Sequence, residues 1–170
     1  MPETPGFRVT VSKQTSVAAL ELLRPGRGCC SARLHDVTLV LLGEVVAEKG
    51  PLSALEILER FQRQGAGCAK DFDGSFVLLW ISPAPAPLLV VTDPLNSLKC
   101  FVEETPESFT LVSSLGFLPP RARSLDRVGL ASFLTNGVIY NNRTIFEGVR
   151  SLRRASIHAV DPGRGISSKA

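Results

Sequence analysis

The stretch from Asp71 to Phe101, DFDGSFVLLWISPAPAPLLVVTDPLNSLKCF, decides the fold class of this chain. It contains two apolar runs, Ser75 to Ile81 and Leu88 to Thr92, on either side of a proline-rich turn. Apolar runs of this length, bounded by Gly and Pro, are typical of strands that are covered on both faces. We therefore predict two adjacent strands of one sheet, with a layer of structure above it and another below it.

The rest of the chain supplies strands and helices for these layers. Gly43 interrupts one apolar strand pattern and predicts a bulge or a close approach of two backbones. One helix is expected to begin at Ser53 as its N-cap and a second one after Asp126, whereas residues 17–23 are expected to form a short helical piece. Further strands are expected over residues 7–11, 37–46, 100–102, 109–113 and 155–160. Helices combined with mostly antiparallel strands predict an α+β layered domain.

The composition is typical of one globular domain. The chain has 170 residues, of which 44% are hydrophobic and 21% charged, and its net charge is only +3. The basic residues are scattered, so we expect no nucleic-acid partner. The sequence has no apolar run of about 18 residues and no secretory signal, so we expect a cytoplasmic protein without a membrane segment. The four cysteines and two histidines form no zinc pattern, so we expect no metal and no cofactor.

Several short motifs follow one another in a family order. Together they resemble the glutaminase domain of asparagine-synthetase-type proteins, a family that includes β-lactam synthetases and lasso-peptide cyclases. The resemblance covers residues 37–163. The motifs that carry it are Leu42-Gly43-Glu44-Val45, Phe72-Asp73-Gly74-Ser75-Phe76, Thr92-Asp93-Pro94-Leu95, Leu111-Val112-Ser113-Ser114, Phe133-Leu134-Thr135-Asn136-Gly137 and Arg143-Thr144-Ile145-Phe146-Glu147-Gly148-Val149.

The resemblance implies a fold and a domain organisation. The fold is a four-layer αββα sandwich of the N-terminal-nucleophile hydrolase type, with two mainly antiparallel sheets between helices. Residues 1–163 would form this single domain, and residues 164–170 a frayed tail or the start of a linker to a synthetase domain. The adenylate-binding motif SGGxDS of that second domain does not occur in the sequence, so we do not expect this chain to activate a carboxylate by itself.

The same resemblance implies a glutaminase site that this sequence does not complete. The family nucleophile is a cysteine directly after the initiator methionine, and here that position holds Pro2, which has no nucleophilic side chain. The family asparagine that donates to the oxyanion is replaced by Leu42, although Gly43 and Glu44 follow it as in the family. The family aspartate that binds the substrate amine aligns with Ser53. We therefore expect no catalytic residue and only a vestigial substrate pocket at Gly43, Glu44 and Ser53.

These losses predict a catalytically degenerate domain that serves as a structural or partner-docking module in ATP-dependent amide-bond formation. The expected partner is a synthetase or cyclase domain, in cis or in trans, and a homodimer is left open. One alternative is an active amidotransferase that supplies ammonia through an unrecognised nucleophile. Cleavage before Cys29 or Cys30 could expose such a residue, but too few residues would then precede Gly43 to form the expected strands. A second alternative is a free-standing module that binds a small ligand or a peptide.

Overall fold

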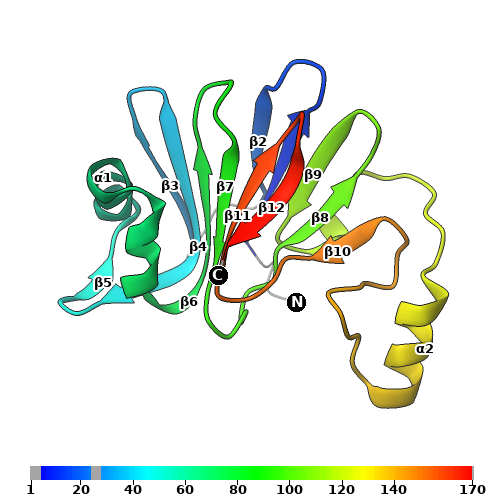
Figure 1. The fold of residues 1–170 in the computed structure, drawn as a ribbon. Coiled ribbons are helices and arrows are strands. Elements are labelled where there is room, and N and C mark those ends of the chain that lie inside the picture. Colours follow the sequence, from blue (N-terminus) through cyan, green and yellow to red (C-terminus); the bar gives the residue numbers. More distant parts are fainter. Residues whose placement is uncertain (1–4, 24–27, 170) are drawn as a thin grey trace.

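The computed structural model describes residues 5–23 and 28–169, and their strands form two antiparallel sheets (Figure 1). The first sheet has five strands in the order β10-β8-β9-β1-β2. Its strands are β1 (Gly6–Ser12), β2 (Ala18–Leu23), β8 (Phe101–Glu104), β9 (Ser108–Val112) and β10 (Val149–Ser151).

The second sheet has seven strands in the order β12-β11-β7-β6-β4-β3, with β5 paired to β4. Its strands are β3 (Cys29–Leu34), β4 (Val37–Ala47), β5 (Gly50–Leu52), β6 (Asp73–Ile81), β7 (Leu88–Thr92), β11 (Ser156–Asp161) and β12 (Gly165–Lys169). The two apolar runs of the 71–101 stretch are β6 and β7, which pair in the middle of this sheet with Leu78 opposite Val91.

The alternation of side chains along β6 shows why this strand reads as apolar throughout. Val77 and Leu79 belong to the core between the two sheets, whereas Phe76 and Leu78 belong to a second core on the outer face. All four side chains are almost fully buried. The prediction that β6 is covered on both faces is therefore confirmed.

The outer core lies beneath two helical elements, α1 (Ala54–Gln64) and the 3₁₀ helix η1 (Ala66–Asp71). Ile57, Leu58 and Phe61 recur at helical spacing and are buried against the sheet. The other helix, α2 (Arg127–Asn136), lies beyond β10, at the end of the molecule opposite α1 (Figure 1). The predicted α+β sandwich of two mainly antiparallel sheets is confirmed.

The outer side of the five-stranded sheet is joined to the chain segment before α2 by ion pairs. Glu103 on β8 is buried and binds Arg121 at 2.6 Å and Arg123 at 2.8 Å. Burial alone would raise the pKa of Glu103, but the hydrogen bonds and charges of Arg123 and Arg121 outweigh it and lower the pKa. These contacts hold the segment that follows the 3₁₀ helix η2 (Leu115–Phe117) on the sheet.

Two segments differ from the sequence-based expectation. The segment 17–23 was expected to form a helical piece, but its residues Ala18–Leu23 form strand β2 and each of them pairs with β1. Residues 165–169, expected as a frayed tail or the start of a linker, form β12 and pair with β11 from Gly165 to Lys169. In both segments, pairing with a strand from elsewhere in the chain overrides a weak local pattern.

Candidate functional site

The predicted site residues lie within β4 and directly after β5. Leu42, Gly43 and Glu44 are consecutive on this strand, and β5 turns back beside it with Leu52 opposite Val45. The next positions along this pair are Glu44 and Ser53. Ser53 follows Leu52 directly, so Gly43, Glu44 and Ser53 lie on neighbouring segments, and a vestigial pocket formed by them stays a prediction.

Leu42 is part of the core between the sheets. Its side chain is 7% exposed and packs in the cluster that also holds Val40 and Val77. A hydrocarbon side chain in this cluster offers no hydrogen-bond donor to a substrate. The position assigned to the oxyanion donor thus contributes to packing in this chain.

The backbone of Gly43 is closely surrounded by other backbone groups of the protein. Gly43 has a φ of +92°, and a Cβ at this position would overlap the carbonyl oxygen of Ser75. Its N–H donates to the carbonyl oxygen of Gly28 at 2.6 Å. The close backbone approach predicted from Gly43 is confirmed, and its amide is already paired within the protein.

Ser53 begins α1 by a capping box. Its Oγ accepts a hydrogen bond from the N–H of Glu56 at 3.3 Å, and its own N–H donates to the Glu56 carboxylate at 2.8 Å. The hydrogen bonds from Ser53 also lower the pKa of Glu56. The side chain of Ser53 is thereby committed to the helix start, and Glu44 is the one predicted pocket residue with an exposed carboxylate.

The structure places one thiol, that of Cys29, close to these residues. It lies opposite Leu42 in the β3–β4 pair, and its Sγ donates to the carbonyl oxygen of Gly6, the first residue of β1, at 3.8 Å. Burial, and secondarily the neighbouring Cys30, raise the pKa of Cys29. A thiol with a raised pKa is a weak nucleophile, because the thiolate is the reactive form.

The strand order also bears on exposure of Cys29 or Cys30 by cleavage. Removing the residues before Cys29 would remove β1 and β2, and β1 lies between β9 and β2 in the five-stranded sheet. The five-stranded sheet would therefore lose both of these strands. The expected nucleophile position, Pro2, lies outside the described residues.

A buried carboxylate organises the loop that lies beside Gly43. Asp93 is fully buried, and its carboxylate accepts hydrogen bonds from the backbone N–H groups of Leu95 at 2.8 Å and Ser97 at 3.0 Å. The loop that it holds places Leu98 in the core between the sheets and close to Gly43. Asp93 is thus a structural group that keeps the space over Gly43 filled.

The second notable feature is an exposed apolar surface on and around α2, which we call the α2 patch. Only Gly129 of this helix is buried. Asp126 caps the helix through the N–H groups of Val128 and Gly129, both at 3.0 Å. The members of the patch are Leu125, Val128, Phe133, Leu134, Val138 and Tyr140, with exposed fractions from 48% to 75%.

The α2 patch is unusual for a surface helix. Apolar residues occur around most of the circumference of α2, a pattern typical of a helix that is buried on several sides. Isolated exposed apolar residues are common in proteins, whereas groups of large ones are typical of interaction surfaces. This surface could not be recognised from the sequence, where the same residues predict burial.

Within residues 5–23 and 28–169, no three His, Cys, Asp or Glu side chains gather as in a metal site. No helix in these ranges is long and apolar enough to cross a membrane.

Comparisons with known proteins give only distant likenesses. No family model matches the sequence, and no curated protein matches it. Among solved structures, glutamine phosphoribosylpyrophosphate amidotransferase from B. subtilis, complexed with ADP and GMP, is 11% identical with a TM-score of 0.47. A structure described as the allosteric regulatory enzyme of purine biosynthesis is 10% identical, also with a TM-score of 0.47. Each likeness covers 98% of this chain and 43% of the other, so the chain spans less than half the length of either protein.

Proposed function

We propose that this chain is a catalytically degenerate glutaminase-like domain of the asparagine-synthetase type and that it docks onto a synthetase or cyclase domain. The partner would carry out ATP-dependent amide-bond formation. The observation that carries the docking role is the α2 patch, whose residues are apolar and yet exposed. The degenerate state is a separate claim, and it is supported by the geometry around Gly43.

Three features support the loss of glutaminase activity. Leu42 has no donor for an oxyanion, and the N–H of Gly43 is paired with Gly28. The nearby thiol of Cys29 has a raised pKa and donates into the protein. Removing one oxyanion donor typically costs about 10²–10³ in rate, so a site without its donors and without an activated nucleophile should be inactive.

The degenerate state is tested by measuring glutamate release from glutamine. We expect no release above the protein-free rate and no covalent labelling by 6-diazo-5-oxonorleucine, an electrophilic glutamine analogue. Glutamate release that is abolished by Cys29→Ala or Cys30→Ala would instead establish an active amidotransferase with an unrecognised nucleophile.

The docking role is tested with a pair of leucines that differ in location but not in exposure. Leu134, in the α2 patch, is 75% exposed, and Leu95, in the turn after β7, is 77% exposed. We expect Leu134→Ser to weaken binding to a purified synthetase domain of the asparagine-synthetase type at least tenfold, measured by calorimetry. Leu95→Ser should change the dissociation constant less than twofold.

The same pair of variants tests the homodimer. If the α2 patch joins two copies of this chain, sedimentation will show a dimer that Leu134→Ser dissociates and Leu95→Ser preserves. Equal effects of the two substitutions on both forms of association would contradict a docking role for the α2 patch.

A further inference from the structure

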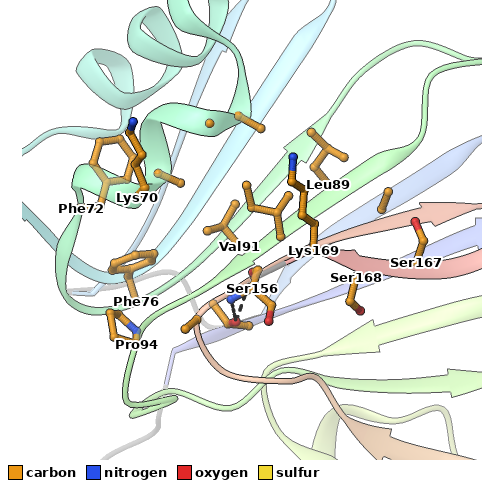
Figure 2. Close-up of a pocket in the computed structure, with 17 residues that line it drawn as sticks. Lys70, Phe72, Phe76, Leu89, Val91, Pro94, Ser156, Ser167, Ser168 and Lys169 are labelled. Atoms are coloured by element: carbon orange, nitrogen blue, oxygen red, sulfur yellow. Dashed lines mark hydrogen bonds between the residues drawn. The ribbon is translucent and has the colours of Figure 1, made fainter.

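The outer face of the seven-stranded sheet is hollowed where α1 does not cover it. The hollow has a volume of about 650 Å³ and lies between η1 on one side and β12 on the other. Its floor consists of apolar side chains from β7 and β11, and Phe72 and Phe76 form one wall (Figure 2). We call this hollow the β7–β11 groove.

The strand register explains why this place is hollow. Leu89 lies opposite Ala159 and Ala159 opposite Ser167, so one row across three strands ends in two small side chains. The neighbouring row runs from Val91 through Ile157 to Lys169. Small residues in one row beside larger ones in the next leave a trough with an apolar floor.

The charges of the groove have one sign. Among the residues that the structure describes, Lys70 on η1 and Lys169 on β12 are the charged ones that line it, and no Asp or Glu side chain does. Neither lysine forms an ion pair with an acidic residue of the described chain. Figure 2 shows Lys70 near Phe72 and Lys169 near Leu89, with Val91 drawn between them.

Most other polar groups along the walls already have partners. The Thr92 hydroxyl donates to the carbonyl oxygen of Arg153 at 2.6 Å, and the Ser156 hydroxyl donates to that of Arg154 at 2.8 Å. Ser168 is hydrogen-bonded to His158 at 2.7 Å. Polar recognition in the groove is therefore left mainly to the two ammonium groups.

We propose that the β7–β11 groove binds a small amphiphilic carboxylate, whose aliphatic body lies on the floor and whose carboxylate pairs with Lys70 or Lys169. The volume lies within the roughly 300–1,000 Å³ of small-molecule sites, which are mostly apolar with a few polar groups. The apolar floor of Leu89, Val91 and Ile157 offers a surface on which an aliphatic chain can be buried. The lysines select an anion over a cation.

Trp80 provides a local reporter for this site. It is the one tryptophan of the chain and lies opposite Leu89 in the β6–β7 pair, so its side chain shares the face of the sheet that forms the groove floor. A bromine atom on a ligand quenches indole fluorescence only at short range. Quenching of Trp80 by 11-bromoundecanoate, below its micelle concentration, therefore reports occupancy of the groove.

The test compares substitutions within the groove with matched ones outside it. We expect saturable quenching, from which a dissociation constant is obtained. This constant should rise at least tenfold in the Lys70→Glu/Lys169→Glu double variant and less than twofold in Lys49→Glu, a charge reversal in an exposed turn. Ala159→Phe should abolish saturable quenching by filling the trough, whereas Ala86→Phe, in the exposed turn before β7, should preserve it. 11-Bromoundecanol should bind at least tenfold more weakly than the carboxylate and should not respond to the charge reversal.

Three results would overturn this proposal. One is quenching that does not saturate, and another is equal affinity in Ala159→Phe and the unchanged protein. The third is loss of binding in Ala159→Phe without any effect of the double charge reversal, because the groove would then bind apolar compounds without recognising a carboxylate. The lysine substitutions lie on exposed side chains, so the double variant is expected to fold and its melting temperature confirms this.

Discussion

The two helices of this protein use apolar residues in opposite ways. In α1, Ile57, Leu58 and Phe61 are buried against the seven-stranded sheet, and the polar face is exposed. In α2, only Gly129 is buried, while Phe133 and Leu134 are exposed. The first helix therefore stabilises the fold of the chain itself, whereas the apolar residues of the second contribute little to it and are available to another molecule.

The attachment of the two helices differs accordingly. Apolar packing holds α1 on the sheet, where its Phe61 also stacks on Trp80 with ring centroids 5.2 Å apart. Polar and backbone contacts hold α2, namely the Asp126 cap, the ion pair of Asp126 with Arg143 at 2.6 Å, and the approach of Gly129 to the backbone of Thr144. Apolar packing and polar anchoring respond differently to mutation and pH, which makes the contrast testable.

The largest effect is expected from shortening a buried leucine of α1. Leu58→Ala should lower the free energy of unfolding by about 2–5 kcal/mol, because the removed atoms are fully buried and leave a cavity. Leu134→Ala in α2 should change it by less than about 0.5 kcal/mol, since that side chain is 75% exposed. Urea denaturation of both variants measures the two values. Similar losses in the two helices would refute the contrast between them.

A smaller effect is expected where α2 approaches the backbone of Thr144. A Cβ on Gly129 would overlap the carbonyl oxygen of Thr144, so Gly129→Ala should cost about 1–3 kcal/mol and displace α2. Gly116→Ala serves as the control, because a Cβ there has only an ordinary contact with Ser114 at 3.8 Å. Thermal unfolding measures stability, and hydrogen exchange of the α2 amides reports the displacement. Slow exchange that persists in Gly129→Ala would contradict this mode of attachment.

Some elements of the fold can be predicted from their own residues, and others depend on a partner strand. The strands β6 and β7 and the helix α1 follow from their own residues, through continuous apolar runs and through Ser53 with the helical spacing after it. Strands β2, β3 and β12 carry weak or polar patterns and exist because a partner strand pairs with them. The local sequence does not reveal such a partner. For this reason the helical piece expected over 17–23 was wrong, and the expectation of a frayed tail or linker over 164–170 did not include β12.

The candidate site divides in a similar way. The close approach of two backbones at Gly43 could be predicted, because it depends on the identity of a single residue. The position of Cys29 beside Gly6 depends on contact between the two sheets and could not. The exposure of Leu134 could not be predicted either, because an apolar helical residue indicates burial whether the cover comes from the same chain or from another.

The capping box of α1 provides the next test. Ser53→Ala removes a hydroxyl that accepts from the N–H of Glu56 and should cost about 1 kcal/mol. Ser53→Asp restores an acceptor at the N-cap and should recover most of this loss, because aspartate caps helices well. Melting temperatures of the two variants check this. If Ser53→Asp is no more stable than Ser53→Ala, the role of Ser53 is not capping.

The smallest expected effect is a pH dependence of stability that differs between the seven-stranded sheet and α2. Burial lowers the pKa of His158 on β11, so this imidazole stays neutral in the folded protein at a pH where the unfolded chain takes up a proton. Stability is then lost as the pH falls below the ordinary value of 6.5, by at most about 1 kcal/mol between pH 6.5 and 5.5. At α2, the N–H of Gly129 and the charge of Arg143 lower the pKa of Asp126, so the stability that this cap provides is lost only below the ordinary carboxyl range, at more acidic pH.

Two histidine variants identify the source of the first phase. The free energy of unfolding, measured by denaturation from pH 7.5 to 5, should no longer fall with pH in His158→Gln, because the buried group that titrates has been removed. His35→Gln should retain this pH dependence, because His35 is exposed. If stability still fell with decreasing pH in His158→Gln, protonation of His158 would not explain the loss. The seven-stranded sheet would then lose stability in acid for another reason, and pH could not be used to separate the stability of the sheet from the anchoring of α2.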